Sequence, residues 1–119
     1  MHSDEPPTIL PTADLSLWRL AETSRLMAHP SRLALLEILA HEGTAPLDLL
    51  EIRTGLSNPT VRQHLRLLRR SGVIEPGEKL PSPGGPGRRR LTYRLDGDRV
   101  DLVGHDLSAF LDRLGAGAS

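Results

Sequence analysis

The fold of this chain is decided by residues 55–72, which read GLSNPTVRQHLRLLRRSG. Ser57 is a favoured N-cap, Pro59 suits the first turn of a helix, and Gly72 is a favoured helix end. Apolar residues recur between them at helical spacing, namely Val61, Leu65 and Leu68. The stretch therefore predicts an amphipathic helix. Its apolar face packs against the protein, and its basic face meets an anionic partner whose exposed edges the side chains can recognise. That other face holds Arg62, Gln63, Arg66, Arg69 and Arg70.

Length and composition restrict the possible classes of protein. The chain has 119 residues and no cysteine, so it is one domain by size and has neither disulfides nor thiolate chemistry. No apolar run approaches the roughly 20 residues of a membrane span, and residues 1–11 do not resemble a signal peptide. No acid/base constellation or phosphate-binding loop is recognisable. We therefore expect a cytoplasmic protein that is not an enzyme and has no membrane partner.

Charge is segregated along the chain although the net charge is zero. Residues 57–94 contain nine basic and two acidic residues, a net charge of +7, which leaves −7 for the rest. A basic segment in an otherwise acidic protein is typical of a surface that binds a polyanion. The alternative, an ordinary solvated surface, would not need such segregation.

Helical patterns precede the central stretch. After a proline-rich arm over residues 1–12, we expect helices over residues 14–27, 30–43 and 46–55. The third of these and the central helix are separated only by a short turn after Gly55. Two helices joined in this way match the helix-turn-helix pattern.

A change of period follows Gly72. Residues 73–75 and 88–95 predict strands, the second with Leu91, Tyr93 and Leu95 packed and the alternating Arg90, Thr92 and Arg94 in solvent. The segment between them is rich in proline and glycine and predicts a long hairpin tip. The sequence thus indicates a mainly α fold with a small β-hairpin wing (α+β), a winged helix-turn-helix in the order ααααββα.

The last predicted helix starts at Asp98, ends near Leu114 and carries a regular apolar stripe. The first helix also has a second apolar side, and together these two features predict a homodimer interface. We expect one domain over residues 13–114, with a flexible tail over residues 115–119. The predicted interface residues are Leu17, Trp18, Val103, Leu107, Phe110, Leu111 and Leu114.

Three separated motifs resemble the ArsR/SmtB family of bacterial regulators. They are LMAHPSRL at residues 26–33, TVRQHLRLL at residues 60–68 followed by SGVI at 71–74, and RRRLTYRL at 88–95. The resemblance covers residues 20–114. It implies a homodimer, joined through the first and last helices, that represses an operon at a palindromic operator on double-stranded DNA. A ligand, often a metal ion, then releases the DNA.

The resemblance places the start of the central helix in the major groove, with Asn58, Thr60, Arg62 and Gln63 reading bases. Arginine suits guanine, and asparagine or glutamine suits adenine. Pro59 and Arg62 stand where the family usually has serine, so the operator of a relative does not transfer. The residues predicted to contact the DNA backbone are His64, Arg66, Arg69, Arg70, Arg88, Arg89 and Arg90. For His64 a structural role is equally open, and the alternative to both is a role as a ligand.

No cofactor is certain from the sequence, and a divalent metal is one hypothesis. The cysteines of the family's third-helix metal site are absent, and neither histidine of its final-helix site is kept. Asp101 and His105, four residues apart, nevertheless share one helix face, with Asp98 and Asp112 as secondary candidates. Two such sets across a dimer would suit nickel, cobalt or zinc. The alternatives are a regulator without a metal effector, and a winged-helix module whose arginines bind an acidic protein.

Metal binding can be tested by calorimetry. If His105 is a ligand, the wild-type protein binds nickel, cobalt or zinc and the His105→Ala variant binds it at least tenfold more weakly, as expected when a metal site loses a ligand. Equal binding by the two proteins would remove His105 from the site.

Overall fold

The computed structural model describes residues 14–81 and 89–118. In chain order its elements are α1 (Asp14–Met27), α2 (Pro30–Glu42), β1 (Thr44–Pro46), α3 (Leu47–Thr54), α4 (Asn58–Ser71), β2 (Ile74–Pro76), β3 (Leu80–Pro81), β4 (Arg89–Arg90), β5 (Thr92–Leu95) and α5 (Gly97–Ala118). The predicted class, mainly α with a small antiparallel sheet in a winged helix-turn-helix, is confirmed. None of the helices in these ranges has the length and apolar character needed to cross a membrane.

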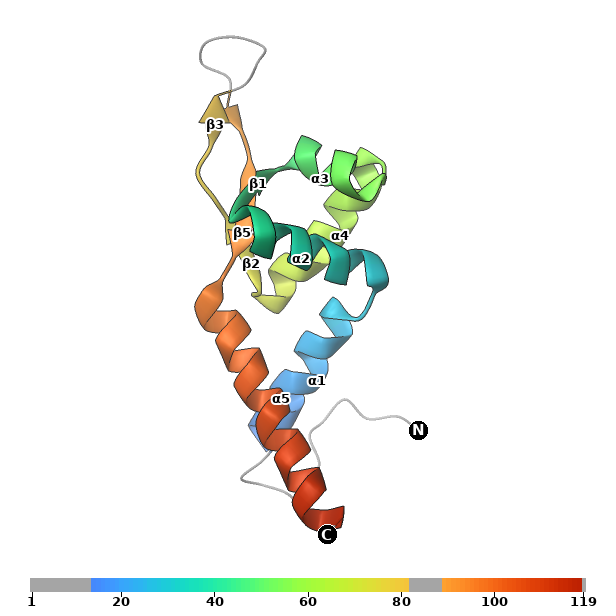
Figure 1. Cartoon of the computed structure of the whole chain (residues 1–119), viewed down its shortest axis with the longest axis vertical. Coiled ribbons are helices and arrows are strands. Elements are labelled where there is room, and N and C mark those ends of the chain that lie inside the picture. Colours follow the sequence, from blue (N-terminus) through green and yellow to red (C-terminus); the bar gives the residue numbers. More distant parts are fainter. Residues whose placement is uncertain (1–13, 82–88, 119) are drawn as a thin grey trace.

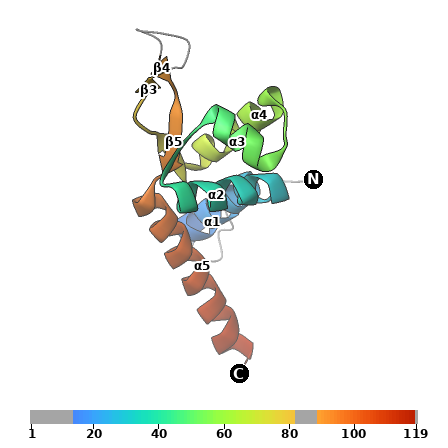
Figure 2. The same cartoon turned by 45° about the horizontal axis from the view of Figure 1, so that its top comes forward.

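The sheet joins the wing to the helices. β5 lies between β1 and β2, antiparallel to both, while β3 and β4 pair with each other in the wing. Figure 1 shows the wing at one end of the molecule and α1 beside α5 at the other. When the molecule is turned, α3 and α4 lie together on the wing side of α2 (Figure 2).

The predicted element order lacked β1. Its three residues are too few to show the alternation that marks a strand in a sequence. Only the pairing of Ala45 with Tyr93, and of its neighbours with the rest of β5, defines it. Ala45 is fully buried there and belongs to the hydrophobic core, so β1 also contributes to the core.

The apolar face of α4 forms the centre of the core, as predicted. Val61, Leu65 and Leu68 are each at most 2% exposed. They pack with Leu35 and Leu39 of α2 and with Leu50 of α3. Ile74 of β2 and Val73, the residue before it, complete this cluster. Burial of each such side chain stabilises the fold by about 1.5–3 kcal/mol, so the orientation of α4 follows from its sequence.

Glycines end both helices of the helix-turn-helix, α3 and α4. Gly55 has φ 72° and donates its N–H to the carbonyl of Glu51, and Gly72 has φ 84° and donates to Arg69. This left-handed conformation is favourable for glycine and unfavourable for residues with a Cβ atom. The predicted ends at these residues are confirmed. Ser57 is the N-cap residue of α4, but its hydroxyl pairs with that of Thr60 rather than with a backbone N–H.

The wing departs from the predicted alternation. Thr92 is fully buried and donates its hydroxyl to the carbonyl of Glu78, whereas Leu91 is 53% exposed. The prediction that Leu91 packs and Thr92 faces solvent is therefore wrong. Leu91 lies in a break between β4 and β5, and such a break interrupts the period of two on which the prediction depended.

The ends of α5 also differ from the prediction. Asp96, not Asp98, is its cap, because the carboxylate of Asp96 accepts the N–H of Arg99 at 3.2 Å and its carbonyl accepts that of Val100. The helix continues past the expected end at Leu114 to Ala118. The predicted arm over residues 1–12 lies outside the described residues.

A histidine is buried where α4 meets α2. His64 is 9% exposed, its ring centroid lies 4.7 Å from that of His29, and its Nδ1 lies 3.3 Å from Nη1 of Arg32. This position favours the structural role over the predicted contact with the DNA backbone. Burial, followed by the charges of His29 and Arg32, lowers the pKa of His64 below its ordinary 6.5.

The lowered pKa predicts a loss of stability in acid. Below about pH 6.5 the unfolded chain takes up a proton at His64, whereas the folded protein resists protonation there. The free energy of unfolding therefore decreases as the pH is lowered. The fall stops once the folded-state pKa is passed. Urea unfolding at about pH 7.5 and about pH 5, at one protein concentration, should show a smaller difference for His64→Gln than for the wild type. An unchanged difference in His64→Gln would contradict the assignment.

Candidate nucleic-acid interface

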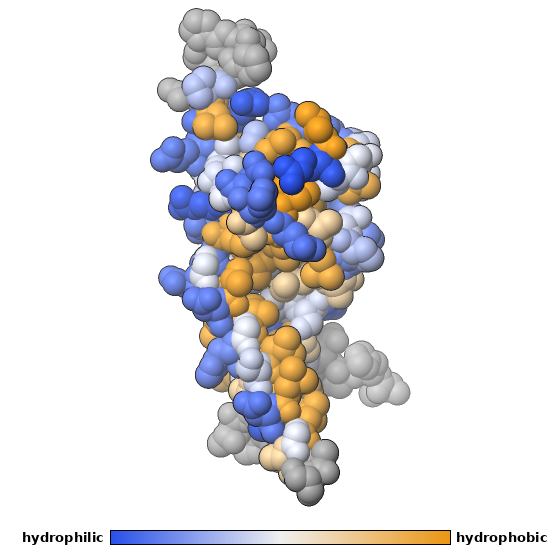
Figure 3. Space-filling model, in the orientation of Figure 1, coloured by the Kyte–Doolittle hydropathy of each residue, from blue (hydrophilic) through white to orange (hydrophobic). Residues whose placement is uncertain are grey.

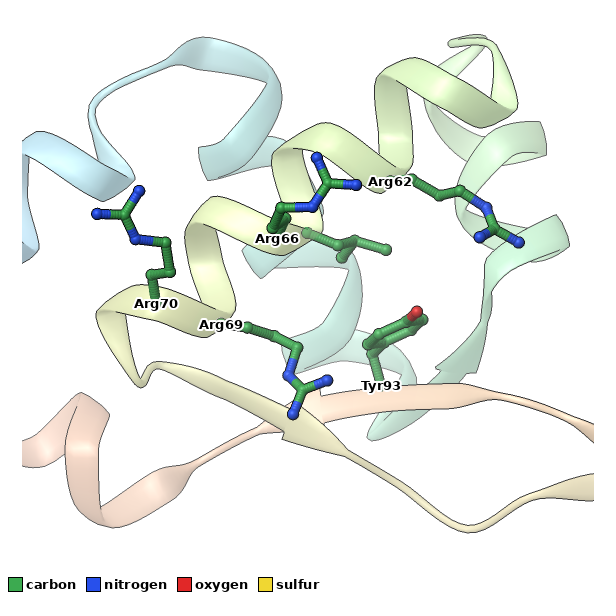
Figure 4. Close-up of a pocket in the computed structure, with 6 residues that line it drawn as sticks. Arg62, Arg66, Arg69, Arg70 and Tyr93 are labelled. Atoms are coloured by element: carbon green, nitrogen blue, oxygen red, sulfur yellow. The ribbon is translucent and has the colours of Figure 1, made fainter.

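The outer face of α4 presents four exposed arginines in one row. Arg62, Arg66, Arg69 and Arg70 border an open hollow of about 440 Å³, with Leu65 and Tyr93. Figure 4 shows Arg69 directed toward β2 and β5, Arg62 at the other end of the row, and Tyr93 rising from β5 beneath the helix. Among the residues that the structure describes, no acidic side chain lines this hollow. A lining of this charge attracts anions such as phosphate groups.

The four predicted base-reading residues lie together at the start of α4. Thr60, Arg62 and Gln63 are exposed, and Asn58 is half-buried. Three of them have partners within the chain: Asn58 donates to Glu51 at 3.5 Å, Thr60 bonds Ser57, and Gln63 accepts from Arg66. The bonds of Thr60 and Gln63 lie at the exposed surface and can therefore be exchanged for bonds to a partner, whereas the bond of Asn58 is partly buried.

Arg62 differs from these three. Within the described residues it makes no hydrogen bond or ion pair, and the same holds for Arg69. Arg62 also borders a second hollow of about 380 Å³ that lies between α3 and the wing. Its guanidinium therefore has access to both sides of the helix start, which suits a side chain that must reach a base edge.

The wing arginines do not behave as one group. Arg90 donates its Nη1 to Asp48 of α3 at 2.7 Å, so in this structure it fastens the wing to the helix-turn-helix instead of projecting toward DNA. Arg94 is likewise paired, with Glu75 of the neighbouring strand at 2.7 Å. Arg88 and the side chain of Arg89 lie outside the described residues.

Some residues of the interface were not predicted from the sequence. Tyr93 was expected to pack, yet it is half-buried and borders both hollows. Asp48 and Glu51 of α3 hold polar side chains of the wing and of α4. Only the pairing of distant segments reveals them, because Asp48 and Arg90 are far apart in the chain.

The metal candidates are exposed on α5. Asp98, Asp101, His105 and Asp112 are spread along this helix. In the described part of one chain, no three His, Asp or Glu side chains come close enough together to hold a metal ion. The predicted site uses two copies of α5, so the single chain leaves it a prediction.

The predicted interface residues lie on α1 and α5. Trp18 is 43% exposed, and Leu107, Leu111 and Leu114 are about equally or more exposed. Leu17, Val103 and Phe110 are half-buried. Exposed apolar residues on two adjacent helices are typical of a protein-binding surface.

An ion pair that the sequence did not predict orients these two helices. Arg19 of α1 donates through Nε and Nη2 to the two carboxylate oxygens of the buried Asp106 on α5, both at 2.7 Å. Hydrogen bonding by Arg19 lowers the pKa of Asp106. Such a bidentate pair fixes direction as well as distance, so it sets the angle at which α1 meets α5.

Comparison with known proteins agrees with this geometry. Residues 27–76 match a family described as a helix-turn-helix domain. An uncharacterized HTH-type transcriptional regulator of Mycobacterium tuberculosis is 37% identical over 54 residues, 45% of this chain and 47% of its own length. The match therefore spans about half the length of that relative.

Two solved structures share the fold. One is described as a possible transcriptional regulator for arsenical resistance; it has 28% identity, a TM-score of 0.60, and coverage of 82% of this chain and 97% of its own. The other is a homodimeric winged helix-turn-helix DNA-binding domain from Mycobacterium bovis, a possible ArsR-family regulator, with 20% identity, a TM-score of 0.56 and coverage of 90% and 87%. With the basic helix α4, the wing and the two flanking helices in place, this chain has a winged helix-turn-helix fold and is similar to ArsR-family regulators.

Proposed function

We propose that the protein is a transcriptional regulator that binds double-stranded DNA through α4. The observation that carries the proposal is the row of four arginines on the exposed face of a helix whose other face is fully buried. An α-helix fits the major groove, and its first turns are the part that meets base edges in helix-turn-helix proteins. The names of the relatives, which are regulators, support the same conclusion.

The two ends of α4 would have different tasks. Asn58, Thr60, Arg62 and Gln63 at the start are the proposed base readers, and Arg66, Arg69 and Arg70 further along are proposed to bind phosphates. The phosphate contacts would provide affinity, and the first turn would provide sequence preference. Arg88 and Arg89 of the wing are proposed to reach the neighbouring backbone or minor groove.

We further propose that the protein is a homodimer joined through α1 and α5. The exposed apolar side chains of these helices support this, as does the homodimeric state named for the Mycobacterium bovis domain. Two-fold symmetry would present two copies of α4 to half-sites about 34–36 Å apart. The operator is accordingly proposed to be palindromic.

A divalent metal remains the proposed effector. Asp101 and His105 are exposed, and within the described residues neither takes part in a hydrogen bond or ion pair. They lie on α5, the helix proposed to pack on its copy, so a metal held there would connect the dimer interface to the DNA-binding unit.

DNA binding can be measured by fluorescence anisotropy with fragments of the protein's own promoter region at several salt concentrations. Arg62→Ala with Gln63→Ala should reduce discrimination between operator and unrelated DNA by about 1–3 kcal/mol for each base that is no longer read. Arg69→Ala should weaken binding to all DNA and lower the salt-dependence slope by about one.

The exposed Arg25 on α1, paired with Glu22 and outside the hollow, provides a matched control, and Arg25→Ala should bind as the wild type does. An unchanged operator preference in the double variant would refute the base-reading assignment. If no fragment binds specifically at physiological salt, an acidic protein becomes the better candidate partner for the arginines.

The dimer is tested by sedimentation velocity. Leu111→Glu places a charge among the exposed apolar residues of α5 and should convert the dimer to monomers, because an unpaired charge cannot be buried in the interface. Leu33→Glu, at a similarly exposed leucine of α2, should leave the dimer intact. A wild-type-like dimer of Leu111→Glu would rule out this interface.

A further inference from the structure

An apolar hollow lies where α2 meets the first half of α5. It has a volume of about 240 Å³ and is distinct from the two hollows beside α4. Hydrophobic surface covers the region between α2 and the start of α5 in Figure 3 and continues along α5. The apolar lining comes from α1, α2, β5, α5 and the residue before β2, and includes Met27, Leu36, Val73, Leu95, Val100 and Val103.

The size of the hollow limits what it can hold. Pockets for drug-sized ligands measure about 300–1,000 Å³, and a dry apolar cavity of about 150 Å³ accepts benzene. The hollow lies between these limits. It therefore suits a molecule with one small ring or a short branched chain, attached to a group that stays at the open side.

One charged side chain stands at this open side. Glu37 is exposed and, among the described residues, is the only ionisable one in the lining. Within the described residues its carboxylate takes part in no hydrogen bond or ion pair. Glu42 on the same helix is instead bonded to Arg53 at 3.1 Å. A carboxylate without a partner beside an apolar hollow attracts a cation whose remaining part is apolar.

We propose that this hollow is a binding site for a small organic amine. Its ring or branched chain lies against Leu36, Val73 and Leu95, and its ammonium group pairs with Glu37. An amine here bridges α2 to α5. Any effect on DNA binding would rest on the function proposed above, but binding of the amine itself does not.

The site is tested with the full chain by ¹H–¹⁵N NMR titration without DNA, so that failure of this proposal is separate from failure of DNA binding. The probe is 2-phenylethylamine, and 3-phenylpropionate, which has a similar ring and chain but the opposite charge, is its control. The wild type should bind the amine saturably and more tightly than the acid, with shifts at the amides of Ala40, Val73 and Val103.

Three variants separate charge from shape. Glu37→Gln should weaken amine binding by about two- to fivefold, the range for an exposed ion pair, and abolish the preference over the acid. Glu42→Gln, the matched control on the same helix, should bind as the wild type does. Ala40→Leu, which extends a lining side chain into the hollow, should weaken both probes while the rest of the spectrum reports an intact fold.

The opposite results overturn the proposal. The first is no saturable binding to the wild type, as expected if another copy of the chain covers the hollow. The others are equal affinity for amine and acid, and equal effects of Glu37→Gln and Glu42→Gln. Shifts confined to residues away from the hollow would also overturn it.

Discussion

The structure depends on the burial of one side of α4. Val61, Leu65 and Leu68 are held among leucines of α2 and α3 and against the start of β2. Protein interiors are close-packed, so these side chains leave the helix no freedom to rotate about its axis. Because the arginines lie on the same rigid helix, the face on which they are presented is a consequence of the core. The chemistry of the outer face is thus preorganised by the packing of the inner one.

Acidic residues around the basic face hold its side chains in position and do not neutralise its charge. Asp48 holds Arg90, Glu75 holds Arg94, and Glu51 reaches Asn58. Each pair is at least partly exposed, so each contributes little to stability and can exchange with a phosphate or a base. Their main physical effect is positional, since they connect the wing to α3, β5 to β2, and α3 to α4. Arg62 and Arg69 remain without such a partner in the described residues.

A second set of contacts joins α1 to α5 at the end of the molecule away from the wing. The bidentate pair of Arg19 and Asp106 orients the two helices, and their exposed apolar side chains leave a surface that one chain does not cover. The apolar hollow lies between this unit and α2. Whatever fills or covers that hollow contacts both α2 and α5, because side chains from both helices form its walls.

The sequence by itself determined the helices, their glycine ends and the two faces of α4, since these depend on spacing within a short segment and on the backbone freedom of glycine. The mainly α class with a wing followed from the order of such segments. Only the tertiary structure decided features that join distant residues, namely β1, the burial of Thr92 and His64, and the pairs Arg90–Asp48 and Arg19–Asp106. A hydrogen-bond or ion-pair partner far along the chain leaves no periodic trace in the sequence. For that reason the basic face could be predicted residue by residue, whereas Tyr93 at its base and the hollow beside α5 could not.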